Sequence, residues 1–384
     1  MGGALNPAPA ARERRLLIVA GEASGDAHAA RLVQALRSRG DVRVRAVAGP
    51  RLRAAGAETI VPQEDLAVIG FSGILAKLPV LFAARKAILA ELATFQPDAV
   101  LLVDYPGFNL RLGPQLKQRG ARVLYYIAPQ VWAWHAERAA EMAAWVDRLA
   151  VVFPFERPIF EAAGVNTTFV GHPLLDDLAP ELDEAAFRAE LGIGPAQRIV
   201  GLLPGSRVGE LKAHATTLLQ VGASLAERFS DVVPVVALAE GRSLAHVDPA
   251  LVAKVRVVKG RTHAVQAYAA CCVVASGTAT LETALLGTPL AIVYRVGWLN
   301  HAIAKRVIKL QHIGLPNIVA GREVAPEFVQ DAFRAEVLVD TLGGWLADPA
   351  VLAARRAALA DLKASLGGPG CSERLADLVW ERLQ

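Results

Sequence analysis

The sequence predicts an α/β protein with two Rossmann-like, parallel-sheet domains that face a cleft, followed by a helical C-terminal tail. Three observations predict this fold class. Short runs of leucine and β-branched residues recur along the chain, and each is followed by a glycine-bearing turn and a helical stretch. Continuously apolar strands that alternate with helices are typical of a parallel sheet covered on both faces. The alternation restarts in the second half, and 384 residues exceed the usual size of one domain.

The first half opens with one full unit of this pattern, RLLIVAGEASGDAHAARLVQALRSRG. The expected elements are, in order, a strand at 16–20, a loop at 21–26, a helix at 27–37, and strands in VRVRAVAG, at 99–103, in RVLYYIAP and in RLAVVFPFE. Residues 1–13 lack the pattern and are expected to form a flexible tail. Residues 14–172 are therefore assigned to an N-terminal domain.

The second half repeats the alternation, with strands expected in RIVGLLPGS, VVPVVALA, VRVVKG, CCVVASG and PLAIVYR. The linking segment VGHPLLDDLAPELDEAAF is interrupted by Pro173 and Pro180, which places the domain boundary near residue 173. Residues 173–345 form the predicted C-terminal domain. Residues 346–384 follow it with a helical pattern.

The composition narrows the classes of function. A net charge of +4 is too small to indicate a nucleic-acid-binding protein, but it suits an anionic small ligand or an anionic membrane surface. Three cysteines, two of them adjacent, form neither a disulfide framework nor a CxxC zinc motif, so a reducing cytoplasm is the simple interpretation. The N-terminus lacks the apolar core of a signal peptide.

The stretch LLPGSRVGEL, residues 202–211, combines the end of a strand with the start of a helix. A helix N-terminus presents unpaired backbone N–H groups and the positive end of the helix dipole. Gly205 lets a ligand approach the backbone, and Ser206 and Arg207 add donors, so a diphosphate suits this site. An ordinary strand–helix turn whose arginine makes a surface ion pair explains the same residues.

A second junction of this kind lies in VVASGTATLETALLGTPLAIVYR. Its strand ends at Ala275, and Ser276, Gly277 and Thr278 form the loop. Glu282, expected in the first turn of the helix, suits the hydroxyl groups of a ribose or simply stabilises the helix N-terminus. Two such loops in one domain favour a nucleotide diphosphate.

Carboxylates follow two strands of the N-terminal domain. In GEASGD, Glu22 and Asp26 lie at a helix start, where they suit sugar hydroxyl groups or act as caps. This segment is neither a GxGxxG dinucleotide fingerprint nor a P-loop. In VDYPGFN, Asp104 lies at the end of a buried strand and is a candidate general base, or else a cap of the next turn.

Two hydrophobic segments of the first half allow a packing interpretation and a functional one. The window 66–92 is broken by Gly70, Gly73 and Pro79, so it is expected to form a buried helix pair or an exposed patch that docks on a membrane. The candidate patch residues are Ile69, Phe71, Ile74, Leu75, Leu78, Leu81 and Phe82. The aromatic residues of PQVWAWHAE suit core packing or stacking on a sugar ring.

Eight segments, in this order, resemble the lipid-A-disaccharide synthase family: AGEASGD, DYPGFN, PQVWAW, VFPFE, VGHPL, LLPGSR, ASGTATLE and LPNIVAGRE. The resemblance implies a GT-B glycosyltransferase that joins UDP-2,3-diacylglucosamine to 2,3-diacylglucosamine 1-phosphate (lipid X). The products are the β-1,6-linked lipid A disaccharide 1-phosphate and UDP. The resemblance also implies inversion at the anomeric centre, no metal or other cofactor, and a cytoplasmic location, peripheral on the inner membrane.

The resemblance implies roles for individual residues as well. The residues expected to bind the donor nucleotide are Gly205, Ser206, Arg207, Ser276, Gly277, Thr278, Glu282, Asn317 and Arg322. Asp104 is expected to take the proton from the acceptor 6-hydroxyl group. The residues expected on the acceptor side are Glu22, Ser24 and Asp26. The patch in the window 66–92 corresponds to the acyl-chain and membrane region of the family.

The domains receive roles on the same basis. Residues 14–172 become the acceptor- and membrane-facing domain, and residues 173–345 become the UDP-sugar-binding domain. Some members of the family form homodimers by exchanging C-terminal segments. The helices at 346–384 are therefore expected to pack back on the N-terminal domain or to be exchanged in a dimer.

Two other functions fit the same fold. A UDP-sugar 2-epimerase-like enzyme uses this architecture with soluble substrates, and the apolar window 66–92 argues against it. A non-catalytic nucleotide-sugar or lipid binder also fits, because a fold does not fix a function. Copurification with phospholipid would argue against the epimerase, and loss of turnover on replacement of Asp104 would exclude the pure binder.

Overall fold

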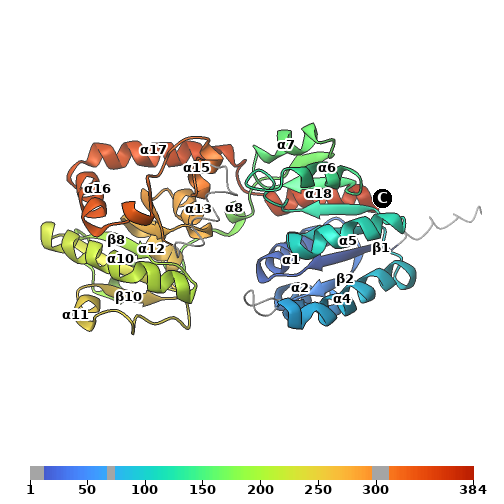
Figure 1. The fold of residues 1–384 in the computed structure, drawn as a ribbon, viewed down its shortest axis with the longest axis horizontal. Coiled ribbons are helices and arrows are strands. Elements are labelled where there is room, and N and C mark those ends of the chain that lie inside the picture. Colours follow the sequence, from blue (N-terminus) through green and yellow to red (C-terminus); the bar gives the residue numbers. More distant parts are fainter. Residues whose placement is uncertain (1–12, 67–73, 296–310) are drawn as a thin grey trace, which may run out of the picture. The chain divides into compact units, whose positions relative to one another are not determined.

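The computed structural model describes residues 13–66, 74–295 and 311–384, with only the backbone for 74–77. The chain forms two compact units, Met1–Pro173 together with Pro369–Gln384, and Leu174–Gly368 (Figure 1). The division between Pro173 and Leu174 lies beside the boundary that the sequence indicates near residue 173. The predicted flexible tail, residues 1–13, lies almost entirely outside the described residues.

The first unit is built on a seven-stranded parallel sheet in the order β3-β2-β1-β4-β5-β6-β7. Its strands are β1 (Arg14–Ala20), β2 (Val42–Ala48), β3 (Glu58–Pro62), β4 (Ala99–Val103), β5 (Val123–Tyr126), β6 (Arg148–Val151) and β7 (Thr167–Phe169). Its helices are α1 (Ala23–Arg37), α2 (Pro50–Ala54), α3 (Gln63–Leu66), α4 (Ile74–Thr94), α5 (Pro106–Gln118), α6 (Glu137–Ala143), α7 (Glu156–Ala162) and α18 (Cys371–Leu383). Every residue of β4 and β5 is buried, as expected of strands covered on both faces.

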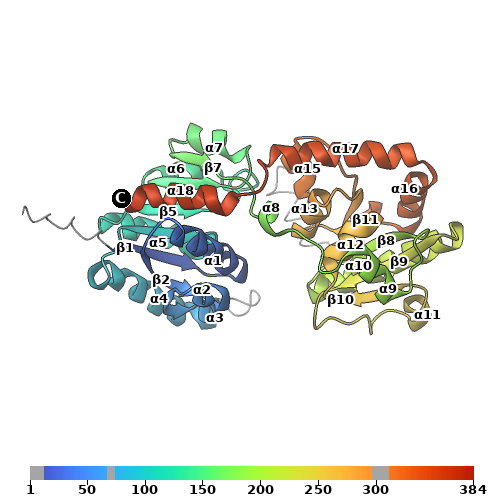
Figure 2. The ribbon, with the colours of Figure 1, turned by 180° about the vertical axis from the view of Figure 1, so that it is seen from behind.

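The C-terminal helix α18 packs against α1 in the first unit (Figures 1 and 2). The Arg39 guanidinium forms ion pairs with Glu373 and Asp377, at 2.9 and 2.6 Å. The Arg14 guanidinium lies over the Trp380 ring, 3.9 Å from its centre. The end of the chain therefore completes the first unit, although the preceding helices belong to the second.

The second unit has a six-stranded parallel sheet in the order β10-β9-β8-β11-β12-β13. Its strands are β8 (Arg198–Leu203), β9 (Val232–Leu238), β10 (Arg256–Lys259), β11 (Ala269–Ala275), β12 (Leu290–Tyr294) and β13 (Glu327–Val329). Its helices are α8 (Leu174–Asp177), α9 (Glu184–Leu191), α10 (Val208–Arg228), α11 (Pro249–Val252), α12 (Thr262–Tyr268), α13 (Thr278–Leu285), α15 (Leu315–Ala320), η2 (Gln330–Ala332), α16 (Ala335–Ala347) and α17 (Pro349–Ser365).

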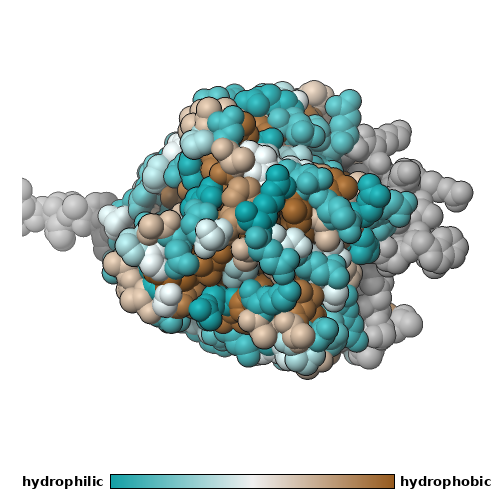
Figure 3. Space-filling model, turned by 90° about the vertical axis from the view of Figure 1, so that its left-hand side faces the viewer, coloured by the Kyte–Doolittle hydropathy of each residue, from teal (hydrophilic) through white to brown (hydrophobic). Residues whose placement is uncertain are grey.

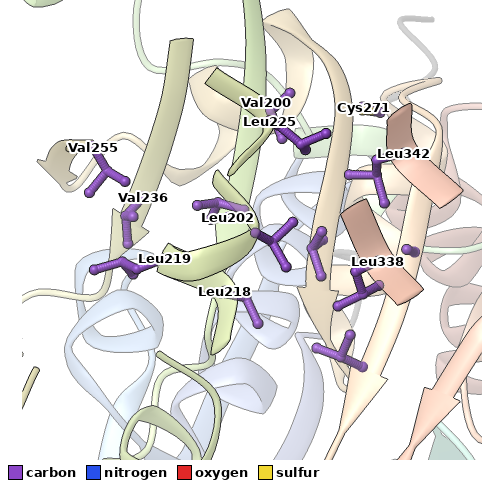
Figure 4. Close-up of a cluster of buried hydrophobic side chains, with 14 of the residues drawn as sticks. Val200, Leu202, Leu218, Leu219, Leu225, Val236, Val255, Cys271, Leu338 and Leu342 are labelled. Carbon is purple, nitrogen blue, oxygen red and sulfur yellow. The ribbon is translucent and has the colours of Figure 1, made fainter. Parts of the chain in front are cut away.

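A hydrophobic core in the second unit joins its sheet to the helices α10 and α16 (Figure 4). Val200 and Leu202 of β8 belong to one buried cluster with Leu218 of α10 and with Leu338 and Leu342 of α16. Burying each such aliphatic side chain stabilises the fold by about 1.5–3 kcal/mol. On the side of this unit that Figure 3 shows, the surface is mostly hydrophilic, with hydrophobic residues in small groups.

Among the described residues, no single helix has the length and apolar character needed to cross a bilayer. Helices α16 and α17 meet that test of length and composition only as a pair, and the pair is bent by 99°. Leu338, Leu342 and Trp345 of α16 are buried in the core of the second unit.

The strands expected from the apolar runs are all present. The structure differs from the sequence prediction at the edges of the sheets and at the starts of two helices. Three further strands, β3, β7 and β13, lie at sheet edges and are too short and too mixed in polarity to give an apolar run. Helix α1 begins at Ala23 rather than at residue 27, because residues of weak helix propensity cost little free energy in the first turn of a helix. Helix α13 begins at Thr278, so Glu282 lies in its second turn rather than in its first.

The strand order reverses once in each sheet. The reversal lies between β1 and β4 in the first sheet and between β8 and β11 in the second. In open α/β sheets, ligands bind outside the carboxyl ends of the strands at such a switch point. Residues 21–26 follow β1, and Asp104 follows β4. Residues 204–207 follow β8, and residues 276–277 follow β11. The fold therefore brings the predicted sites to the switch point of each sheet.

Candidate active site

A cavity of about 360 Å³ lies at the carboxyl ends of β8, β9 and β11 in the second unit. Seven of the residues predicted to bind the nucleotide line it: Gly205, Ser206, Arg207, Ser276, Gly277, Thr278 and Glu282. The first residues of α12 and α13, Thr262 and Thr278, also belong to its wall. Two loops that are far apart in the sequence thus form one site.

The loop 204–207 presents three hydrogen-bond donors to one point. Gly205 has a φ of +104°, and a Cβ there would lie 2.6 Å from a carboxylate oxygen of Glu210, so only glycine fits. The backbone N–H groups of Ser206 and Arg207 both donate to Glu210 over 3.1 Å. The Arg207 guanidinium lies 2.9 Å from the same carboxylate, and the Arg207 side chain is 84% exposed. This geometry suits an anion.

The second loop of the cavity consists of Ser276 and Gly277, and Thr278 is the first residue of α13. The Ser276 hydroxyl donates to the Ile313 carbonyl over 3.2 Å, which fixes the loop against the segment before α15. The first turn of α13 adds backbone N–H groups that a helix leaves without intrahelical partners. Such groups favour a negatively charged ligand at the same cavity.

Glu282 reaches the cavity from the second turn of α13. Burial raises the pKa of its carboxyl group, and the nearby His263 opposes that shift. The Nε2 atom of His263 lies 3.9 Å from the Glu282 carboxylate, and its Nδ1 atom lies 3.8 Å from the Glu181 carboxylate. A carboxylate held in this way can accept hydrogen bonds from the hydroxyl groups of a ribose.

Asn317 and Arg322 are not among the residues that line this cavity. Asn317 is fully buried, and its side-chain oxygen accepts from the backbone N–H groups of Val324 and Ala325 at 2.7 and 2.9 Å. Its amide nitrogen donates to the Glu327 carboxylate over 2.7 Å. Asn317 therefore holds the turn between α15 and β13. Arg322 is exposed on that turn.

In the first unit, Asp104 and Glu22 follow the neighbouring strands β4 and β1. Burial, with a further effect of the negative charge of Glu22, raises the pKa of Asp104 to about 6. At pH 7 such a carboxyl group is mostly ionised and accepts a proton more readily than an ordinary aspartate. Glu22 and Ser24 are both exposed at the start of α1. The arrangement suits a general base.

The turn that carries Asp104 is strained and held from several sides. Asp104 and Tyr105 have φ values of +46° and +49°, which are unfavourable for residues other than glycine. The Asn109 amide and the Tyr125 hydroxyl both donate to the Asp104 carbonyl, over 2.7 and 2.8 Å. The Tyr105 ring leaves no room for a Cβ at Gly21. Sequence reasoning missed Asn109 and Tyr125 as supports, although Asn109 ends the motif VDYPGFN.

Replacing Asn109 by alanine is expected to lower kcat about tenfold, because the strained turn loses one of its two donors and Asp104 moves from its place. The free energy of unfolding should fall by about 1–3 kcal/mol, since a buried hydrogen bond is lost. Steady-state rates, the pH profile of kcat/KM and chemical denaturation measure these effects. Tyr125→Phe removes the second donor to the Asp104 carbonyl and tests its contribution in the same way. An unchanged kcat and pH profile, with only the stability loss, would show that Asn109 has no part in positioning Asp104.

Asp26 differs from the other two residues expected on the acceptor side. It is 2% exposed, and its carboxylate accepts from the backbone N–H groups of Gly49, Arg51 and Leu52 at 2.7, 2.9 and 3.2 Å. These contacts cap the start of α2. In this structure Asp26 therefore acts as a helix cap, which is the alternative to a contact with a ligand.

Glu156 anchors the aromatic segment that follows β5. Its carboxylate accepts from the Trp132 indole N–H and from the Phe153 backbone N–H, each over 3.1 Å. Burial raises the pKa of Glu156 to about 7. Trp132 also packs edge-on against Phe155, with ring centres 5.3 Å apart, whereas Trp134 is 47% exposed. Trp132 is thus a packing residue, and sequence reasoning gave no role to Glu156 in the segment VFPFE.

The part of the chain that the structure describes contains no group of three or more His, Cys, Asp or Glu side chains arranged to hold a metal ion. Cys271 and Cys272 are fully buried in β11, and neither lines the cavity. Burial raises the pKa of Cys271 to about 12, so this thiol stays protonated near neutral pH.

Comparison with known proteins places the chain in a family. The family model described as Lipid-A-disaccharide synthetase matches residues 16–345 of the chain. A lipid-A-disaccharide synthase from Geobacter metallireducens is 42% identical over 377 residues, which are 97% of this chain and 98% of that protein. A lipid-A-disaccharide synthase from Anaeromyxobacter sp. (strain K) is 40% identical over 370 residues, which are 95% of this chain and 96% of that protein.

Solved structures show the fold. A putative UDP-N-acetylglucosamine 2-epimerase from Listeria monocytogenes superposes with a TM-score of 0.64 at 13% identity, over 96% of this chain and 95% of that one. CalG4, the calicheamicin glycosyltransferase, superposes with a TM-score of 0.60 at 19% identity, over 97% and 99%. Both support two Rossmann-like, parallel-sheet domains with C-terminal helices, as in GT-B glycosyltransferases and epimerases. At these identities the likeness concerns the fold alone.

Proposed function

Because this chain belongs to the lipid-A-disaccharide synthase family, and is a glycosyltransferase of lipid A biosynthesis, we propose a division of the reaction between its two units. The cavity of the second unit takes the donor, UDP-2,3-diacylglucosamine. The diphosphate lies at the starts of α10 and α13, and Glu282 accepts from the ribose. The observation that carries this proposal is the convergence of seven candidate residues from two distant loops on one cavity of about 360 Å³.

The acceptor, 2,3-diacylglucosamine 1-phosphate, belongs in this proposal to the first unit, at Asp104, Glu22 and Ser24. Asp104 takes the proton of the acceptor 6-hydroxyl group while the oxygen attacks C1 of the donor sugar. The bond from C1 to the β-phosphate oxygen breaks, and the anomeric centre inverts. The products are the β-1,6 disaccharide 1-phosphate, UDP and a proton on Asp104. The pKa of Asp104, raised to about 6, supports this role.

UDP departs with negative charge that develops on its β-phosphate. In the proposed mechanism the Arg207 guanidinium and the backbone N–H groups of Ser206 and Arg207 offset that charge, together with the start of α13. Donors fixed in place before the reaction stabilise such charge most effectively. The proposal needs no metal ion or other cofactor.

Incubation of the full chain with both substrates, with and without EDTA, tests this function. Mass spectrometry should detect the tetraacyl disaccharide 1-phosphate and UDP in equal amounts, at the same rate under both conditions. Absence of the disaccharide would contradict the substrate assignment. Product that disappears only with EDTA would contradict the metal-independent mechanism and leave the substrates in place.

We also propose that α4 docks on the cytoplasmic surface of the inner membrane. Leu78, Val80 and Phe82 are 36%, 38% and 56% exposed on this helix, and the Arg85 guanidinium lies 4.9 Å from the centre of the Phe82 ring. Apolar side chains beside a cation suit an anionic lipid surface. Leu81 packs instead on the core of the first unit, so it does not belong to the exposed surface.

The other members of the predicted patch lack a described side chain. Ile69 and Phe71 lie outside the described residues, and only the backbone is described for Ile74 and Leu75. Their contact with lipid stays a prediction of the resemblance. The cytoplasmic location and the homodimer stay predictions of the resemblance as well.

Replacing Leu78 and Phe82 together by serine is expected to weaken binding to vesicles with anionic lipid about tenfold, because two apolar side chains no longer enter the interface. Cosedimentation with vesicles measures the partition coefficient. Ile159→Ser is the matched control, because Ile159 is also 36% exposed but lies on α7. Equal binding of the double variant and wild type would remove α4 from the docking surface.

A further inference from the structure

The anion site of the second unit is occupied by a carboxylate of the chain itself. One oxygen of Glu210 accepts from the backbone N–H groups of Ser206 and Arg207, each over 3.1 Å. The other oxygen lies 2.9 Å from the Arg207 guanidinium. These are the same three donors that the proposed function gives to the diphosphate. A nucleoside diphosphate and the Glu210 carboxylate therefore compete for them.

Helix capping accounts for only part of this arrangement. Glu210 is the third residue of α10, and its carboxylate accepts from the backbone N–H of Arg207, the capping residue of this helix. Capping by an acidic third residue needs one hydrogen bond, which the backbone N–H of the capping residue donates to the carboxylate. The bond to Ser206 and the contact to the Arg207 guanidinium go beyond that need. The Glu210 side chain, 18% exposed, also lines the cavity.

We propose that Glu210 sets the affinity of the cavity for the nucleoside diphosphate. Its carboxylate holds the three donors when the cavity is empty, and it must give them up when the diphosphate binds. This inference rests on the proposed function, since it assumes that the diphosphate binds at the start of α10.

In this proposal Glu210 also favours the release of UDP after the reaction. Donors that stabilise the charge on the leaving group also hold the finished product, and product release limits the turnover of many enzymes. An anion within the chain that returns to the same donors weakens the hold on UDP. Two negative charges a few ångströms apart repel each other, so Glu210 opposes UDP both by occupying its donors and by its charge.

Glu210→Gln tests the proposal on the full chain, with UDP and uridine as ligands in calorimetric titrations. Glutamine keeps the size of the side chain and an oxygen that can accept from the Arg207 backbone N–H, but it removes the charge. UDP should bind the variant about 3- to 10-fold more tightly than wild type, because a neutral amide competes less well for the donors. Uridine, which has no phosphate, should bind both proteins equally. The inhibition constant of UDP in the transfer reaction should fall by the same factor.

Glu227→Gln is the matched control. Glu227 lies at the other end of α10, where it pairs with Lys254 over 2.8 Å, and it does not line the cavity. The control changes the net charge by the same amount and should leave UDP affinity unchanged.

If UDP binds Glu210→Gln no more tightly than wild type, the proposal is overturned and Glu210 is a cap alone. An equal gain for uridine would also overturn it, because the gain would then not depend on phosphate. Failure of wild type to bind UDP would contradict the proposed function instead. If the glutamine variant does not fold, Glu210→Ala gives the same comparison, and tighter binding of UDP but not of uridine is again the expected result.

Discussion

Replacing Asp104 by asparagine is expected to lower kcat by about 10²- to 10⁴-fold, because the amide cannot take the proton from the acceptor hydroxyl group. The affinity for UDP should stay within about twofold of wild type, since Asp104 belongs to the first unit and does not line the cavity of the second. Initial rates and calorimetric titration with UDP measure the two effects separately. Lost turnover with retained binding would exclude a non-catalytic nucleotide-sugar binder.

The pH dependence gives an independent check on the same residue. The base must be ionised, so kcat/KM of wild type should fall as the pH drops below about 6, the pKa of Asp104. The folded protein binds this proton more tightly than the unfolded chain, so the contribution of Asp104 to stability is lost as the pH rises from about 4 to about 6. Asp104→Asn should therefore have a higher Tm than wild type at pH 8. Retained turnover in the variant would remove Asp104 from the role of base.

Replacing Arg207 by alanine is expected to lower kcat by about 10²- to 10³-fold, because the charge on the departing β-phosphate loses the one side-chain cation that the described residues contribute to the lining of the cavity. The free energy of unfolding should change by less than about 1 kcal/mol, since the Arg207 side chain is 84% exposed. Single-turnover rates separate the chemical step from the release of UDP.

Lys254→Ala is the control for this variant, because it removes a surface cation of the same unit that does not line the cavity. Its kcat should equal that of wild type. A loss of less than about tenfold for Arg207→Ala would mean that the backbone N–H groups alone stabilise the leaving group. A matching loss of uridine binding would point to a disturbed cavity rather than to lost charge stabilisation.

The sequence predicts the central strands of both sheets and the places where the sites form. Strand β4 is buried along its whole length and β8 at every residue after Arg198, so both appear as continuous apolar runs. The sites then follow from the ends of those runs, because glycine, serine and carboxylates gather where a strand stops and a helix begins. The short edge strands β3, β7 and β13 are only partly buried, and no such run reveals them.

The contacts that support the site are harder to predict, because they join residues through space. Tyr125 reaches the Asp104 carbonyl from β5, the strand beside β4, and nothing in the sequence marks that bond. Glu210 does leave a signal, since an acidic residue in the first turn is typical of a helix start. That signal does not show that the same carboxylate also takes the Ser206 N–H and the guanidinium.

Motif membership can place a residue near a site without showing what its side chain does. Asn317 and Arg322 lie in the segment LPNIVAGRE, but the described structure uses Asn317 to hold a buried turn and leaves Arg322 exposed. Asp26 lies two residues after Ser24, yet its carboxylate caps α2. A short polar side chain can bind backbone or ligand equally well, and only the folded chain decides between them.

A crystal structure of the full chain soaked with UDP tests most directly whether the starts of α10 and α13 bind the diphosphate of UDP. Electron density for the two phosphates should lie within hydrogen-bonding distance of the Ser206 and Arg207 backbone N–H groups, with the guanidinium of Arg207 beside them and Glu210 turned away. Density for UDP at any other place, or an Arg207 side chain that points away from the phosphates, would contradict the account.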